Sequence, residues 1–260
     1  MPPVLSPSLL LPLVLMFVLV AVRIAFLLVA APLFGTAVLP GQLRAAAVVV
    51  LSVALFPGLA NARPPSLEPS SILIAVLGEA ALGASAGLAV RILFAAAEGA
   101  GHVVGISMGI GFSQIVDPMS STPSMITTRF FNTVMSLMFL VMDGHHVLIR
   151  LLARSFRTLP PGQVIPDPEM GIGLARAASA IFTGMIELAA PVLIVLLATM
   201  IALGLLTRVA PKMNLFILSF AICIALGLIV LRTSMPTMAA WMGKSILEVE
   251  PAVLRVWEGR

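Results

Sequence analysis

Charged residues are scarce in this sequence, and their scarcity excludes a soluble domain of ordinary composition. Only 10% of the 260 residues are charged, whereas 60% are hydrophobic, and the mean hydropathy is +1.14. Soluble globular domains carry about 25% charged residues. The composition therefore predicts a membrane-associated protein.

Cysteine and clustered basic residues are scarce as well. The single cysteine, Cys223, excludes an intramolecular disulfide and gives no support to a metal–thiolate site. The formal net charge of +4 comes from 15 Lys and Arg residues scattered along the chain. They do not form the dense basic cluster, interleaved with aromatic residues, that is typical of nucleic-acid-binding surfaces. We therefore expect no binding to nucleic acid.

Motifs of catalysis and cofactor binding are also missing. The chain has no P-loop, Rossmann glycine pattern, catalytic triad or paired carboxylates in a credible context. Asp143, His145 and His146 suggest a metal site, but neighbouring histidines diverge by about 100° on a helix and the HExxH spacing is absent. We expect no enzyme activity, no cofactor and no metal.

Long hydrophobic runs dominate the chain and predict an all-α protein of membrane-associated helical hairpins. A run of about 18 or more apolar residues is long enough to cross a membrane as a helix. The first run exceeds the length of a signal-peptide core and has no positive charges before it, so we expect it to be retained. About six segments are expected, at residues 9–34, 43–59, 72–97, 125–152, 178–206 and 215–231.

Two features suggest how these segments are divided. A linker with four prolines at residues 158–173 separates the first four segments from the last two, which a short turn at 207–214 joins into a helical hairpin. Apolar residues recur every three or four positions after Leu231, which is typical of an amphipathic helix, broken here near Pro251. We expect four parts, namely residues 1–157, a linker at 158–177, the hairpin 178–235 and the tail 236–260.

The glycine-rich stretch at residues 99–124 is the strongest candidate for a functional element. Gly101, Gly105 and Gly109 lie four apart, so on a helix they form one ridge where another backbone can approach closely. Beyond Gly109 the helix is expected to end, because Pro118 takes Asp117 out of the helical region. In a membrane protein such backbone lies inside protein or lines a wet cavity. An ordinary turn between two spans is the alternative.

A few charged residues lie inside the hydrophobic segments. Arg23 is either a functional residue or a cation that snorkels or pairs inside a helix bundle. Glu79 shares a helix face with Gly83 and Gly87, and it is either an interhelical hydrogen-bonding anchor or a proton carrier. The absence of a second carboxylate at matching spacing favours the anchor. Three arginines at 150, 154 and 157 form a basic helix face suited to lipid phosphates or a partner.

Five sequence blocks, together with Arg23, cover most of the chain in a characteristic order. They are APLFGTAVLPGQLR at 31–44, GEAALGASAG at 78–87, GAGHVVGISMGIGFSQIVDP at 99–118, DGHHVLIRLLARSFRTLPPG at 143–162 and AAPVLIVLLATMIALGLLTRVAPKMNLF at 189–216. In order, spacing and combined coverage they resemble the FliR family of flagellar biosynthetic proteins. This family provides the R subunit of the bacterial type III export gate.

The resemblance implies a non-enzymatic subunit of a hetero-oligomer in the bacterial inner membrane, within the flagellar basal body. It would assemble with P- and Q-type subunits into a helical ring that conducts unfolded export substrates. A B-type subunit would dock on this ring, with an A-type subunit close by. Residues 1–157 resemble the P subunit and residues 178–235 resemble the Q subunit, while membrane lipids would surround the assembly.

The resemblance also assigns roles to particular residues, and it makes the stretch 105–124 a plug inside the channel. Plug and pore-lining residues would be Gly105, Ile106, Met108, Gly109, Ile110, Gly111, Phe112, Ile115, Asp117, Pro118 and Met119. Packing between subunits would involve Arg23, Glu79, Gly83, Gly87, Gly101 and Glu187. A turn that faces partners would contain Arg208, Pro211, Lys212 and Asn214.

Two other classes of protein remain as alternatives. A small-solute or proton-coupled secondary transporter would gather Arg23, Glu79, Arg91 and Glu187 around a broken helix. It predicts two symmetric interrupted helices, whereas this sequence contains one strongly interrupted region. An intramembrane hydrolase based on Asp143 and His145 lacks a recognisable nucleophile.

Overall fold

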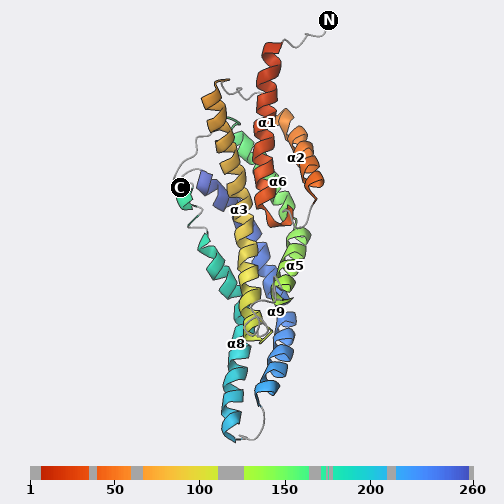
Figure 1. Ribbon diagram of the computed structural model, residues 1–260, viewed down its shortest axis with the longest axis vertical. Helices are drawn as coiled ribbons and strands as arrows, with labels where there is room; N and C mark the ends of the chain where they lie inside the picture. The colour runs from red at the N-terminus through yellow and green to blue at the C-terminus, as the bar shows by residue number, and fades with distance from the viewer. Residues whose placement is uncertain are drawn as a thin grey trace, which may run out of the picture. The chain divides into compact units, whose positions relative to one another are not determined.

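The described part of the chain is helical. A computed structural model describes residues 7–34, 40–59, 67–110, 126–163, 171–173, 175, 178–209 and 215–257 (Figure 1). Within these residues no strand occurs, so the all-α prediction is confirmed. Five of the described helices are long and apolar enough to cross a membrane, and a pair of shorter helices joined by a break forms a sixth candidate.

Helices occur in all six predicted hydrophobic segments. Each of the first two long helices is followed by a short 3-10 helix, η1 or η2, and the third extends into the glycine-rich stretch. Their bounds are α1 Pro7–Ala30, η1 Pro32–Phe34, α2 Gly41–Leu55, η2 Phe56–Leu59, α3 Pro69–Ser107, α5 Ile126–Val141, α6 Gly144–Thr158, α8 Ala180–Val209 and α9 Leu215–Trp257.

The chain folds into two compact units that each combine distant parts of the sequence. The first unit contains Met1–Arg91, Asp143–Ala177 and Leu247–Arg260, and the second contains Ile92–Met142 and Ala178–Ile246. The first part of α3, up to Arg91, and the last part of α9, from Leu247, therefore belong to the first unit. The remainder of both helices belongs to the second unit. The predicted division into P-like and Q-like parts stays a prediction.

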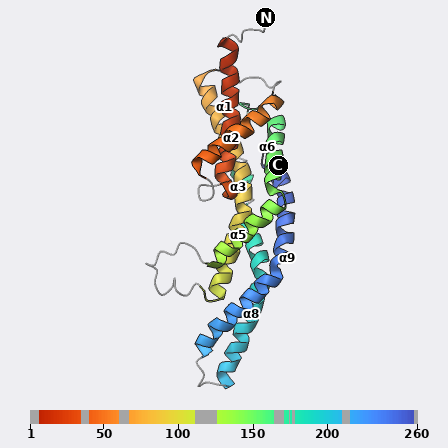
Figure 2. The ribbon, with the colours of Figure 1, turned by 90° about the vertical axis from the view of Figure 1, so that its right-hand side faces the viewer.

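In the first unit α1 lies between α2 and α3 (Figures 1 and 2). Phe17 of α1 packs edge to face on Phe56, with ring centroids 5.7 Å apart. On the other side, Gly83 and Gly87 of α3 allow the backbone of α1 to come close, because a Cβ at Gly83 would collide with the carbonyl oxygen of Arg23. Small residues thus replace side-chain interdigitation at this helix crossing.

In the second unit the later part of α3 contacts α5, α8 and α9. Gly101 lies against the backbone of Thr128 in α5, since an added Cβ would be 2.8 Å from the Thr128 Cα. The close backbone approach expected at this glycine ridge is therefore present, and α5 of the same chain makes it. Phe94 and Phe139 pack with their ring centroids 5.8 Å apart.

One predicted helix is in fact two. Residues 125–152 were expected to form a single helix, but α5 ends at Val141 and α6 begins at Gly144. Asp143 between them has a φ of 58°, in the left-handed region where Asp is among the few tolerated residues. The apolar periodicity on both sides of the break concealed this Asp-Gly turn.

The prediction of a separate C-terminal amphipathic helix that breaks near Pro251 is also wrong in detail. The sixth hydrophobic segment and the tail form one helix, α9, which continues through both Pro236 and Pro251. The tail has the predicted amphipathic face, and this face is buried. Packing therefore compensates for the hydrogen bonds that the prolines cannot donate. The buried residues are Met238, Met242, Ile246, Val249 and Val253.

Candidate functional site

The end of α3 is the described part of the predicted plug. The N–H of Gly109 donates to the carbonyl of Ile106 at 2.9 Å, and the N–H of Ile110 donates to the carbonyl of Gly105 at 3.1 Å. This pair of bonds is the Schellman motif, which requires a left-handed residue just after the helix. Gly109 provides that residue, with a φ of +80°.

The turn after α3 is seated on α9 within the second unit. Met108 is fully buried, and a Cβ at Gly227 would lie 2.7 Å from its Cε. A Cβ at Gly109 would collide with the ring of Phe220. Gly227 and Phe220 are seven residues apart, two turns along one face of α9. The C-terminal end of α3 therefore packs against one face of α9.

The remaining plug residues are only partly described. Gly105 is buried and Ile110 is half-buried, whereas Ile106 is half-exposed. The rest lie outside the described residues, so their place in a channel stays a prediction. They are Gly111, Phe112, Ile115, Asp117, Pro118 and Met119.

A buried ion pair joins α1 to α3 in the first unit. The side chains of Arg23 and Glu79 are both 0% exposed, and Arg23 Nε donates to Glu79 Oε2 at 2.5 Å. Charges in a low-dielectric interior are costly unless they are paired and their other hydrogen-bonding atoms are satisfied. Both of these buried charges meet the first condition by pairing with each other.

The remaining polar atoms of the pair are satisfied by α6 and the turn after it. Arg23 Nη1 donates to Ser155 Oγ, and Nη2 donates to the carbonyl oxygen of Leu159, each at 3.0 Å. Glu79 Oε1 accepts a hydrogen bond of 2.9 Å from the N–H of Gly162. Together they form a polar clamp, defined here as Arg23, Glu79, Ser155 and the backbone of Leu159 and Gly162, which ties three segments together.

This geometry favours the anchor interpretation of Glu79 over the proton-carrier interpretation. Both oxygens of the carboxylate are hydrogen-bonded, one of them to an arginine, and these bonds join α1, α3 and the turn after α6. A role of Arg23 and Glu79 in packing between subunits stays a prediction.

Sequence reasoning missed Ser155, although it is a polar residue between the apolar residues Leu152 and Phe156 on a helix. Phe156 also contacts the clamp, with its ring centroid 4.4 Å from Arg23 Cζ.

The other charged candidates do not join this clamp. Arg91 and Glu187 are exposed, so neither is the buried charge that the transporter alternative requires. Arg208, at the end of α8, is exposed as well, whereas Pro211, Lys212 and Asn214 lie outside the described residues. The structure therefore does not favour a transporter built on these charges.

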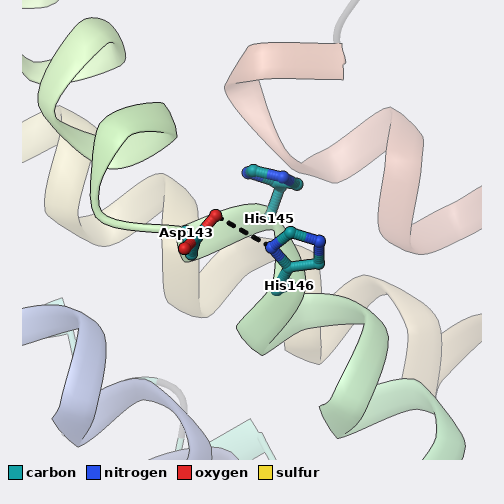
Figure 3. A group of neighbouring side chains, drawn as sticks. All are labelled: Asp143, His145 and His146. Carbon is teal, nitrogen blue, oxygen red and sulfur yellow. Dashed lines mark hydrogen bonds and ion pairs between the residues drawn. The ribbon is translucent and has the colours of Figure 1, made fainter.

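Asp143, His145 and His146 come together at the start of α6 (Figure 3). Asp143 Oδ1 lies 2.9 Å from His146 Nδ1, and the two imidazole rings have centroids 4.2 Å apart. The divergence expected for adjacent histidines is thus not observed. The left-handed backbone at Asp143 places its carboxylate over the first turn of α6, where i and i+3 side chains are neighbours.

Comparison with known proteins gives consistent matches along most of the chain. The family described as "Bacterial export proteins, family 1" matches residues 14–249. The flagellar biosynthetic protein FliR of Pectobacterium carotovorum subsp. carotovorum is 32% identical over 215 residues, which are 83% of this chain and 82% of the relative. FliR of Escherichia coli strain K12 is 30% identical over 217 residues, covering 84% and 83%.

A relative with a different name matches more weakly. The surface presentation of antigens protein SpaR of Salmonella typhimurium strain LT2 is 27% identical over 202 residues, which are 77% of this chain and 75% of the relative. The similarity extends over most of the length of all three relatives, so it concerns the whole architecture and not one local motif.

Proposed function

The chain belongs to family 1 of the bacterial export proteins, the FliR family, and from this premise we propose that it is a core subunit of a flagellar type III export gate. The match over residues 14–249 is the observation that carries the proposal. The candidate membrane spans support an integral membrane component. The bacterial inner membrane, within the flagellar basal body, is the proposed location.

In the proposed gate, the stretch that follows α3 closes the channel for unfolded substrates. The Schellman motif at Gly109 supports this role, because it stops α3 at a defined point where Met108 and Gly109 are packed against α9. Small and apolar side chains from Ile106 to Met119 would then close the pore. Ile110, Phe112, Ile115 and Met119 would exclude ions while the gate is shut. Substrate entry would displace this stretch through its glycine hinges.

The proposed partners are P- and Q-type subunits, with B- and A-type subunits attached to the assembled gate. The apolar outer face of α8 supports a covered position, because large exposed apolar faces need protein or lipid against them. Along this face Ile194 is 67% exposed, Leu197 61% and Leu205 62%. Hetero-oligomer partners and membrane lipids together would cover such a surface.

The direct test is affinity purification of this chain co-expressed with its genomic neighbours, followed by mass spectrometry of the intact complex. A defined assembly with P- and Q-type subunits is the expected result. The chain expressed alone in the same detergent is the control. A stable monomer or homodimer that binds none of these subunits would contradict the export-gate proposal.

A further inference from the structure

The segment Asp143–His146 gathers three side chains with metal-binding atoms (Figure 3). One ligand atom from each of Asp143, His145 and His146 lies within 4.8 Å of the others. A tetrahedral Zn²⁺ ion with bonds of about 2.0–2.2 Å requires its ligands to be about 3.3 Å apart. Asp143 Oδ1 and His146 Nδ1 are already 2.9 Å apart.

The three ligand atoms must come closer together to share one ion, and this requires rotation of side chains. The side chains of Asp143 and His146 are 68% and 56% exposed, so both can rotate without displacing the core. The cluster is therefore close to a metal-binding geometry and is accessible from outside the unit.

Two further observations concern the polar atoms of the cluster. Asp143 is the N-cap of α6, yet its carboxylate faces His146 Nδ1 and makes no capping hydrogen bond, which is the usual role of Asp there. His145 Nδ1 is buried without a hydrogen-bond partner among the described residues. An unpartnered buried polar atom calls for an explanation such as a bound water or ion.

The chemistry of the three ligands selects the class of ion. Two imidazole nitrogens and one carboxylate oxygen suit Zn²⁺ and neighbouring divalent transition metals, whereas Mg²⁺ and Ca²⁺ prefer oxygen ligands alone. Three protein ligands leave at least one position for water or for a donor from another molecule. We propose that Asp143, His145 and His146 bind one divalent transition-metal ion, with Zn²⁺ as the representative member of this class.

The structural consequence is local. A bound ion would link Asp143, which precedes α6, to two residues in the first turn of that helix. It would thereby hold the left-handed backbone at Asp143, a conformation that costs free energy for a residue other than glycine. This site is independent of the proposed plug and involves none of its residues.

The test uses the full chain within its purified complex, carrying an affinity tag without histidine and treated with a chelator. Zn²⁺ is titrated in, and Co²⁺ is used in parallel because its absorption spectrum reports the ligands. The wild type should bind one more ion per copy of this chain than the double variant Asp143→Asn/His146→Gln. His145→Gln and His146→Gln should each weaken binding more than about tenfold, since even outer-shell changes cost 10–100-fold.

The third histidine of the chain provides a matched control. His102 lies exposed on α3 in the other unit, so His102→Gln should leave Zn²⁺ affinity and stoichiometry unchanged. Asn tolerates the left-handed conformation that Asp143 adopts, and each histidine variant tests the site without changing that position. Equal ion content in the wild type and the double variant, or equal losses in His102→Gln and His146→Gln, would overturn the proposal.

Discussion

At the residue scale, the polar clamp shows how an apolar bundle accommodates two full charges. Arg23 and Glu79 are completely buried, and each uses its remaining polar atoms on α6 or on the turn that follows it. Removing one partner of a buried ion pair leaves an uncompensated charge, whereas replacing both by apolar residues can be nearly neutral. The clamp therefore makes a prediction about pairs of substitutions.

We expect Glu79→Leu alone to destabilise the chain by about 3–5 kcal/mol, because it leaves Arg23 buried and unpaired. The double substitution Arg23→Met/Glu79→Leu should recover much of that loss. Thermal unfolding of the purified complex in detergent measures both. As a control, Arg154→Ala removes the exposed ion pair with Glu250 and should cost at most about 1 kcal/mol. Equal destabilisation by the single and the double variant would contradict a pairing role.

Gly83 makes a second prediction at this scale. In Gly83→Ala the new methyl group would collide with the backbone carbonyl of Arg23, so α1 and α3 must separate. Overpacking of this kind costs about 1–3 kcal/mol. Gly58→Ala in η2 is the control, because nothing lies within 4 Å of its added Cβ. Thermal unfolding should show a lower Tm for the first variant only, and similar Tm values for the two would argue against a tight crossing.

At the scale of elements, the end of α3 is determined by Gly109 and by the face of α9 beneath it. Gly109→Ala places a Cβ on a left-handed residue, which costs about 1–2 kcal/mol, and directs it into the ring of Phe220. Replacing Gly109 through Gly111 by alanine should stiffen the region further. We expect reduced secretion of a flagellar substrate and an altered ion leak across the membrane.

Secretion assays and conductance of membranes that contain the complex measure these two effects. Gly58→Ala again provides a glycine-to-alanine control outside α3. If the triple variant exports substrate normally and its ion leak matches that of the wild type, the hinge proposed for the plug is wrong.

The last part of α9 is a second element whose role can be tested. Trp257 Nε1 donates to Ser85 Oγ at 2.8 Å, and Val249 and Val253 are buried within the first unit. Deleting residues 247–260 should therefore lower the amount of folded protein that accumulates. Trp257→Phe, which removes this hydrogen bond and reduces the size of the ring system, should cost at least about 1 kcal/mol. Leu247→Ala is the control, because Leu247 is 77% exposed. Normal accumulation of the truncated chain would show that this segment is dispensable.

At the scale of the whole molecule, apolar surface on the outside of the helices indicates how the chain is placed. The outer face of α8 can meet either lipid or another subunit. A photo-reactive residue at position 197 or 201 should cross-link to a P- or Q-type subunit when these are co-expressed, because we propose that subunits cover this face. Gel analysis and mass spectrometry of the products identify the partner. Products limited to lipid in the assembled complex would place α8 at the membrane instead.

Sequence patterns predicted most helices because hydrophobic length and periodicity are local properties. The same local signals failed at two places. The break at Asp143 lies between two stretches with compatible apolar spacing, and the left-handed residue is not glycine. The prolines of α9 suggested an interruption, but burial of one face keeps the helix continuous. In α9, contacts made outside the segment decided its conformation.

The candidate sites also combine features that single residues predict with contacts that only the fold creates. Gly109, Gly111 and Pro118 predicted the region where α3 ends, because backbone freedom depends on the residue itself. Arg23 and Glu79 stood out as isolated charges among apolar residues, yet their spacing did not indicate which partners they would have. Ser155 and the backbone of Leu159 and Gly162 complete the clamp from more than 70 residues away, as the separations of 132, 136 and 83 residues show.

By itself the sequence determined that this protein is helical and membrane-associated, that the helix containing Gly101 and Gly105 ends soon after Gly109, and that its buried charges require partners. These properties follow from composition, hydrophobic length and the conformational range of single residues. Only the tertiary structure decided that Arg23 binds Glu79 and that Met108 rests against Gly227. Such pairings depend on which surfaces meet when distant segments exclude water and lipid from one another, and no local pattern encodes that choice.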